Sequence, residues 1–261
     1  MIRNDLMGGV KNKVIDKSKS LKRFNNYVSF YDPEDPKIKL KIEHTFHVSE
    51  LSAKIACAVG ADPELAWLIG VLHDIGRFEQ IRRYNTFSDA LSVDHAALGA
   101  DILFRSGLIA EFSSDLTNDQ RCAIEMAVRN HSALTLPKGL TQEEKLYCNI
   151  IRDADKLDGF RVNCETPLEE IYNVSTEELR TSAVSSDVKE CFNRKKAVPR
   201  QLRSTPMDNL VSILCWTFEL VYPVSKKLAK EQGYVNQLLE YQSDNPDTIA
   251  WFAYMRDKIW K

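Results

Sequence analysis

The chain has 261 residues, of which 44% are hydrophobic and 28% are charged, as is ordinary for a globular protein. The formal net charge of −2 gives no basic field for a nucleic-acid polymer. No apolar run approaches the ~20 residues needed to span a bilayer. We therefore expect a globular protein that binds neither nucleic-acid polymers nor membranes.

Two further features bear on the cellular compartment. Residues 1–13, MIRNDLMGGVKNK, lack an apolar stretch followed by a small-residue cleavage site, so we expect no signal peptide. The six cysteines are widely spaced without a Cys-x-x-Cys pair, which is neither a zinc pattern nor a small disulfide scaffold. Most have apolar neighbours, and we expect small buried thiols in a reducing cytoplasm.

Helix signals dominate from about residue 40 onward, because apolar residues recur at helical spacing between polar caps and glycine stops. In chain order, the predicted helices of the middle part span 43–60, 61–76, 92–107, 117–131 and 141–159. The last two open with a Thr and, three residues later, a Gln or Glu, which is the spacing of a capping box. Each predicted helix thus has a local start or stop signal.

The remaining chain carries weaker signals. We expect a loop at 80–93, between the second and third helices, whereas residues 27–40 fit no single pattern. The run 205–223 is apolar over most of its surface and predicts a buried helix that Pro223 kinks or ends. Strand patterns are scarce, so we predict an all-α protein. Its expected parts are an N-terminal segment packed on the domain (1–40), a helical core (41–164) and a helical C-terminal extension (165–261).

Histidines are scarce, and their positions are informative. The chain has five, His44, His47, His73, His95 and His131. All but His47 lie near an end of a predicted helix, Asp74 follows His73 directly, and Asp155 lies late in the fifth helix. In an antiparallel bundle, the end of one helix lies beside the start of the next, which brings these residues to one side. Because buried polar groups cost free energy unless they are hydrogen-bonded or coordinated, this pattern favours a metal site.

The segments EHTFHV, LHDIG, DHAALGA, RNHS and RDADKLD resemble the successive motifs of the HD superfamily of metal-dependent phosphohydrolases. The resemblance covers 44–158 and implies a helical HD-type domain. The implied metal ligands are those of the basic HD site, His44, His73, Asp74 and Asp155, and the two added ones of the dinuclear branch, His95 and His131. That branch includes cyclic-dinucleotide phosphodiesterases and symmetrical dinucleoside tetraphosphate hydrolases. The chain lacks a Gly-Tyr-Pro motif, which disfavours the first of these.

The implied ligand set combines imidazoles and carboxylates, which favours one or two divalent ions of Fe or Mn, with Co, Ni, Zn or Mg as alternatives. In a dinuclear site Asp74 is the natural bridging ligand. Two metals about 3.5–4 Å apart activate water for attack on phosphorus. We expect Arg77 and Lys156 to stabilise the phosphoryl oxygens. Arg82 and Arg83 either bind substrate phosphate or form a solvated basic turn.

We therefore predict a metal-dependent phosphohydrolase, either a phosphomonoesterase or a phosphodiesterase, that acts on a small phosphate ester. The family resemblance points to a nucleotide as that ester. One alternative is a mononuclear nucleotidase-type site without His95 and His131. Another is a metal- or nucleotide-binding regulatory domain without turnover. The oligomeric state is left open.

Overall fold

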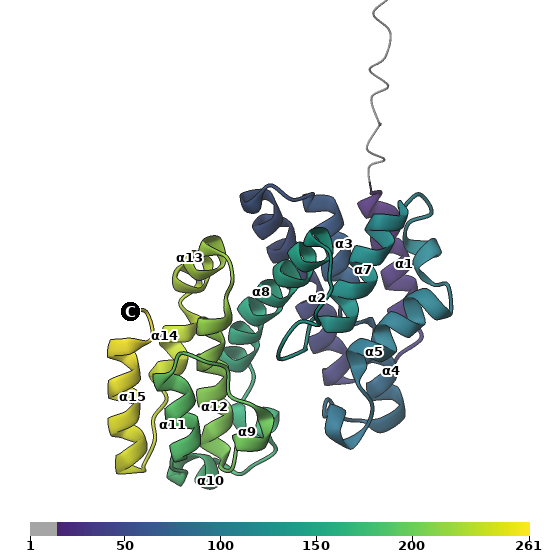
Figure 1. Cartoon of the computed structure of the whole chain (residues 1–261). Coiled ribbons are helices and arrows are strands. Elements are labelled where there is room, and N and C mark those ends of the chain that lie inside the picture. The colour runs from purple at the N-terminus through teal and green to yellow at the C-terminus, as the bar shows by residue number, and fades with distance from the viewer. Residues whose placement is uncertain (1–14) are drawn as a thin grey trace, which may run out of the picture.

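The computed structural model describes residues 15–261, and these residues form helices and turns without a strand (Figure 1). The all-α prediction is therefore confirmed for this part of the chain. Residues 1–14 of the expected N-terminal segment, and with them the region tested for a signal peptide, lie outside the described residues. Within 15–261, no helix combines the length and the apolar character needed to cross a membrane.

Eight helices and two short turns make up the first part of the described chain. They are α1 (Lys17–Val28), α2 (Pro36–Val59), α3 (Pro63–Leu72), α4 (Ile75–Tyr84), the 3-10 turn η1 (Asp89–Leu91), α5 (His95–Ala100), the π-helical turn η2 (Asp101–Arg105), α6 (Ile109–Phe112), α7 (Asn118–Asn130) and α8 (Gln142–Glu165). The two predicted capping boxes are present, at Thr117 before α7 and Thr141 before α8. Local caps thus set where these helices begin.

Close helix crossings bring the ligand-bearing helices together. Helix α2 packs against both α3 and α8, and α4 packs against α5. At the first crossing, a Cβ on Gly70 would lie 2.9 Å from the backbone nitrogen of Ser49. At the α4–α5 crossing, a Cβ on Gly76 would lie 2.6 Å from the backbone nitrogen of Gly99. Both crossings require glycine, because any side chain there would push the helices apart.

The second part of the chain packs on α8, which connects it to the first part (Figure 1). Its elements are α9 (Leu168–Tyr172), α10 (Thr176–Thr181), α11 (Ser186–Asn193), η3 (Arg200–Leu202), α12 (Pro206–Leu214), η4 (Cys215–Glu219), α13 (Pro223–Gln232), α14 (Tyr234–Leu239) and α15 (Pro246–Lys258). The buried Asp153 of α8 accepts hydrogen bonds from the backbone nitrogens of Val221 and Tyr222 at 3.0 Å. This carboxylate therefore attaches the segment before α13 to α8.

Several predicted boundaries were wrong. Helix α2 begins at Pro36, so residues 27–40 contain the end of α1, a turn and the start of α2. Gly76 does not stop a helix: α3 ends at Leu72, and Gly76 lies in the first turn of α4. Because α4 continues to Tyr84, the expected loop at 80–93 is shorter, and η1 lies within it. At Gly76, tertiary packing rather than the local signal decides where a helix ends.

Three further expectations need correction. The predicted helix 92–107 changes from α-helical to π-helical geometry after Ala100. Pro223 occupies the first position of α13, where its missing N–H costs nothing, and the apolar run before it ends in η4. The six cysteines are all free, but only Cys148 and Cys215 are buried, whereas Cys164 and Cys191 are half-buried and Cys57 and Cys122 are exposed.

Candidate metal centre

Five helices deliver the predicted ligands to one place. His44 lies inside α2, His73 and His131 follow the last residues of α3 and α7, and His95 is the first residue of α5. Asp74 separates α3 from α4, and Asp155 lies inside α8. The four imidazoles and Asp74 are buried. The structure thus brings together residues that are more than a hundred positions apart in the sequence.

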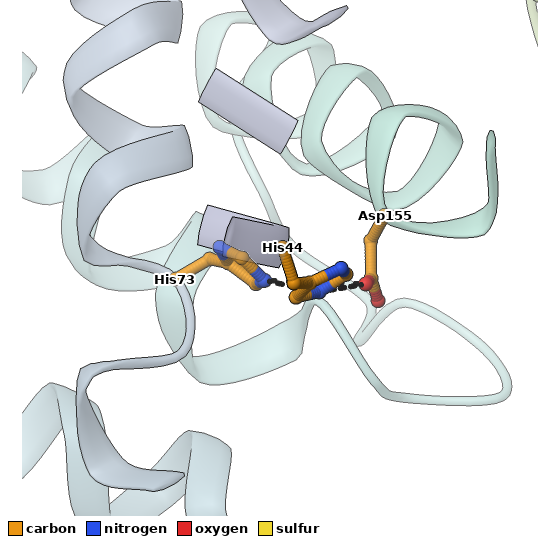
Figure 2. A group of neighbouring side chains, drawn as sticks. All are labelled: His44, His73 and Asp155. Carbon is orange, nitrogen blue, oxygen red and sulfur yellow. Dashed lines mark hydrogen bonds and ion pairs between the residues drawn. The ribbon is translucent and has the colours of Figure 1, made fainter. Parts of the chain in front are cut away.

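The first group of ligand atoms surrounds the Nε2 of His44. This nitrogen lies 3.1 Å from Asp155 Oδ1 and 3.3 Å from His73 Nε2. Figure 2 shows His44 between the other two side chains, with Asp155 reaching in from α8. The three residues each present one ligand atom, and these atoms lie within 4.8 Å of one another. Such spacing suits a single ion bound by two imidazoles and a carboxylate.

The second group lies on the other side of Asp74. His95 Nε2 and His131 Nε2 are 3.0 Å apart, and each is 3.4 Å from Asp74 Oδ1. The other oxygen, Asp74 Oδ2, lies 3.7 Å from His44 Nε2 and 3.5 Å from His73 Nε2. One carboxylate therefore faces two pairs of imidazoles, with a different oxygen toward each pair.

The outer ring nitrogens determine which atoms face the cluster. His73 Nδ1 lies 2.7 Å from the carbonyl oxygen of Gly70, and His131 Nδ1 lies 2.8 Å from that of Val128. Because a carbonyl oxygen only accepts, each Nδ1 must carry the proton and donate it. Each Nε2 then carries a lone pair, which is the form that binds a metal ion.

Carboxylates orient the other two rings. His44 Nδ1 lies 2.6 Å from Asp158 Oδ2, and His95 Nδ1 lies 2.7 Å from Asp89 Oδ2. A histidine that donates to a carboxylate in this way is a stronger metal ligand and has a fixed ring orientation. All four imidazoles thus present Nε2 toward the cluster.

These residues fit divalent ions. Two Nε2 lone pairs that face each other at 3.0–3.3 Å have no proton between them, so they repel unless a cation lies between. The buried Asp74 Oδ1 also has no hydrogen-bond partner among the described residues. A divalent cation with nitrogen and oxygen ligands would satisfy both. Asp89 and Asp94 also lie close to His95. These two aspartates have other roles, because Asp94 caps α5 and Asp89 orients His95.

The electrostatics favour the metal-binding forms of His73, His95 and Asp74. Burial lowers the pKa of His73 to about 3 and that of His95 to about 4, so both rings are neutral at pH 7. Burial alone would raise the pKa of Asp74, but Lys41, the neighbouring histidines and Arg77 together outweigh it and hold that pKa well below its usual range. Neutral imidazoles and an ionised carboxylate are what coordination requires.

Of the cations predicted to bind phosphate, Arg77 lies at the cluster. Its Nε is 3.6 Å from Asp74 Oδ1. Its Nη1 donates to Gln80 Oε1 and the Phe87 carbonyl at 2.7 Å and to Asp89 Oδ1 at 2.9 Å. The guanidinium is therefore fixed beside the bridging carboxylate by α4 and the loop after it.

The other predicted cations have partners of their own. Lys156 is buried, and its ammonium lies 3.7 Å from Glu219 Oε2 in η4. Arg82 and Arg83 both pair with Glu79, and their side chains are half exposed. The structure thus supports the interpretation of Arg82 and Arg83 as a solvated basic turn. The ammonium of Lys156 faces Glu219 in the C-terminal part of the chain.

Three neighbours of the cluster, Lys41, Asp89 and Asp158, were not among the predicted site residues. Lys41 Nζ lies 2.6 Å from Asp74 Oδ2, and Asp89 links Arg77 to His95. Lys41 precedes His44 by one helical turn, a signal that was hidden because the helix was predicted to begin at residue 43. No sequence signal identifies Asp89, because its role depends on how the loop folds back.

A helical bundle that gathers four histidines and two aspartates in this way defines an all-α domain with a candidate metal centre. Residues 42–159 match the family model described as HD domain, and they contain all six candidate ligands. Residues 42–159 thus form an HD domain, a family whose members are generally metal-dependent phosphohydrolases. Searches among curated proteins and among solved structures found no match.

Proposed function

We propose that this protein hydrolyses a small phosphate ester, most specifically a nucleotide, at a centre of two divalent ions. The observation that supports two ions is the placement of Asp74, whose two oxygens each face a different pair of histidine nitrogens. The proposal of a nucleotide rests on the family resemblance.

In this proposal, His44, His73 and Asp155 would hold the first ion and His95 and His131 the second, and Asp74 would be the ligand shared between them. Fe or Mn is the metal we propose, since imidazole-rich sites suit these ions better than Mg or Ca. Ions bound there supply Lewis-acid chemistry, because they lower the pKa of water and stabilise negative charge on a phosphoryl oxygen.

The chain's own residues orient the reaction. Arg77 presents a fixed positive charge beside Asp74, where it binds a phosphoryl oxygen and offsets the charge that develops during attack. Asp89 keeps both Arg77 and His95 in place. Asp158 accepts a hydrogen bond from His44 Nδ1, which keeps the Nε2 of that ring directed at Asp155. Positioning by such hydrogen bonds is what aligns substrate and ligands before reaction.

The test is hydrolysis by metal-stripped protein after Mn or Fe(II) is added back. The substrates are p-nitrophenyl phosphate, bis-p-nitrophenyl phosphate and a set of nucleotides, so monoesterase and diesterase activity are separated. We expect turnover that depends on the added metal and is abolished in Asp74→Asn. Full metal loading without hydrolysis of any ester would contradict the proposal and favour the regulatory alternative.

A further inference from the structure

Lys41 lies at the edge of the cluster, one turn before His44 on α2. Its ammonium nitrogen is 2.6 Å from Asp74 Oδ2, the oxygen that faces His44 and His73. The side chain is largely buried, with an exposed fraction of 16%. A positive charge is therefore positioned directly beside the ligand that joins the two halves of the site.

A single aromatic ring holds Lys41 and Arg77 on the two sides of that carboxylate. Lys41 Nζ lies 5.5 Å from the centre of the Phe87 ring, and the guanidinium carbon of Arg77 lies 5.9 Å from it. Both distances are in the range of cation–π attraction. Lys41 contacts Asp74 Oδ2, whereas Arg77 lies nearer Oδ1. The two cations thus flank the ligand cluster as a pair.

Both cations keep unused donors beside the cluster. Arg77 Nη1 is engaged by three protein acceptors, whereas its Nε has no hydrogen-bond partner among the described residues. The ammonium of Lys41 has three N–H groups, and among residues 15–261 its one hydrogen-bond acceptor is Asp74. It therefore has donors to spare beside the atoms where a phosphoryl group would lie. Lys41 also precedes the residues matched by the family model, which begin at 42.

We propose that Lys41 is a further substrate-binding residue that donates to a phosphoryl oxygen of the ester and of the released phosphate. This inference rests on the proposed function, because it places phosphate at the cluster. The ammonium keeps its contact with Asp74 and uses a second N–H for the phosphate oxygen. Its charge offsets that of the phosphate dianion at a position that Arg77 does not reach.

The test is binding of inorganic phosphate, measured by titration calorimetry on the full chain loaded with Mn. We expect Lys41→Met to weaken phosphate binding by about 10-fold or more, which is the range for loss of a hydrogen bond from a charged donor. Lys41→Arg retains most of the affinity because it keeps the charge. Elemental analysis of each variant shows whether its metal content is unchanged.

Lys37→Met is the matched control. Lys37 lies one turn earlier than Lys41 on α2. Its ammonium donates to Asn85 Oδ1 at 3.0 Å, in the loop after α4 that also carries Phe87, and lies outside the cluster. We expect its phosphate affinity to equal that of the wild type. Wild-type affinity in metal-loaded Lys41→Met would overturn the inference alone. Loss of metal from Lys41→Met would overturn it too, because the ammonium would then serve the ligands. A wild-type protein that binds metal but no phosphate would overturn the proposed function as well.

Discussion

Replacing His131 by Ala should remove about one metal equivalent and leave the other bound. His131 Nε2 lies 3.4 Å from Asp74 Oδ1 and 3.0 Å from His95 Nε2, so the change removes one imidazole of the second group. His44 and Asp155 remain 3.1 Å apart on the other side of Asp74. Because those ligands are unchanged, we expect the first ion to stay bound.

The change should affect turnover far more than folding. The folded state loses the hydrogen bond from Nδ1 to the Val128 carbonyl, worth about 1 kcal/mol, and part of a buried ring. We expect a total cost of about 1–3 kcal/mol in the free energy of unfolding. Loss of a residue that merely hydrogen-bonds a metal ligand typically lowers activity by roughly 10–100-fold. Loss of a ligand itself should therefore lower turnover by at least about 100-fold.

Elemental analysis of wild type and His131→Ala, purified side by side with Mn or Fe supplied, measures the metal content. His47→Ala is the control, because His47 lies on α2 near His44 but is 46% exposed and contacts Asp158 rather than the cluster. Its metal content should match that of the wild type. Equal metal content in wild type and His131→Ala would refute the dinuclear assignment and favour the mononuclear one.

Three further predictions test the supports of the site. Asp158→Asn should lower metal affinity by roughly 10–100-fold, measured by chelator competition, because His44 loses the carboxylate that orients its ring. Gly76→Ala should lower the free energy of unfolding, measured by urea denaturation, by about 3 kcal/mol, because its Cβ would meet the backbone of His95. Gly139→Ala is the control: its Cβ would have nothing within 4 Å, so it should cost less despite the positive φ of Gly139. Removing the metal with EDTA should lower the melting temperature, since bound ions at 100 times their Kd contribute about 2.7 kcal/mol; an unchanged melting temperature would count against a metal centre.

Local signals were sufficient where a helix begins at a side-chain cap. Thr117 and Thr141 accept the backbone hydrogen bonds that their spacing predicted, and α7 and α8 begin there. The start of α2 was missed because KIKLKIE alternates apolar and polar residues, which is a strand pattern. Gly76 was misread for a different reason: glycine ends many helices, but here it allows α4 and α5 to touch. That contact is tertiary, and no local pattern encodes it.

The candidate ligands were predictable by type, because few histidines occur and each adjoins a helix signal. The surrounding contacts were less predictable. Lys156 follows Asp155 in the sequence, but consecutive helical residues point about 100° apart, and its ammonium contacts Glu219 in η4. The pairing of Arg82 and Arg83 with Glu79 follows the three- and four-residue spacing of helical ion pairs, but it was missed because residues 80–93 were predicted to form a loop.

Gly70 affects both the packing of two helices and the orientation of a candidate ligand. Its missing Cβ lets α3 approach Ser49 of α2, and its carbonyl oxygen accepts a hydrogen bond from His73 Nδ1. A shift of this crossing therefore rotates one imidazole while it also moves the helix that carries His44. Variants that alter metal selectivity should consequently appear among small, nonpolar positions at helix contacts. A mutational scan restricted to charged and aromatic side chains would overlook them.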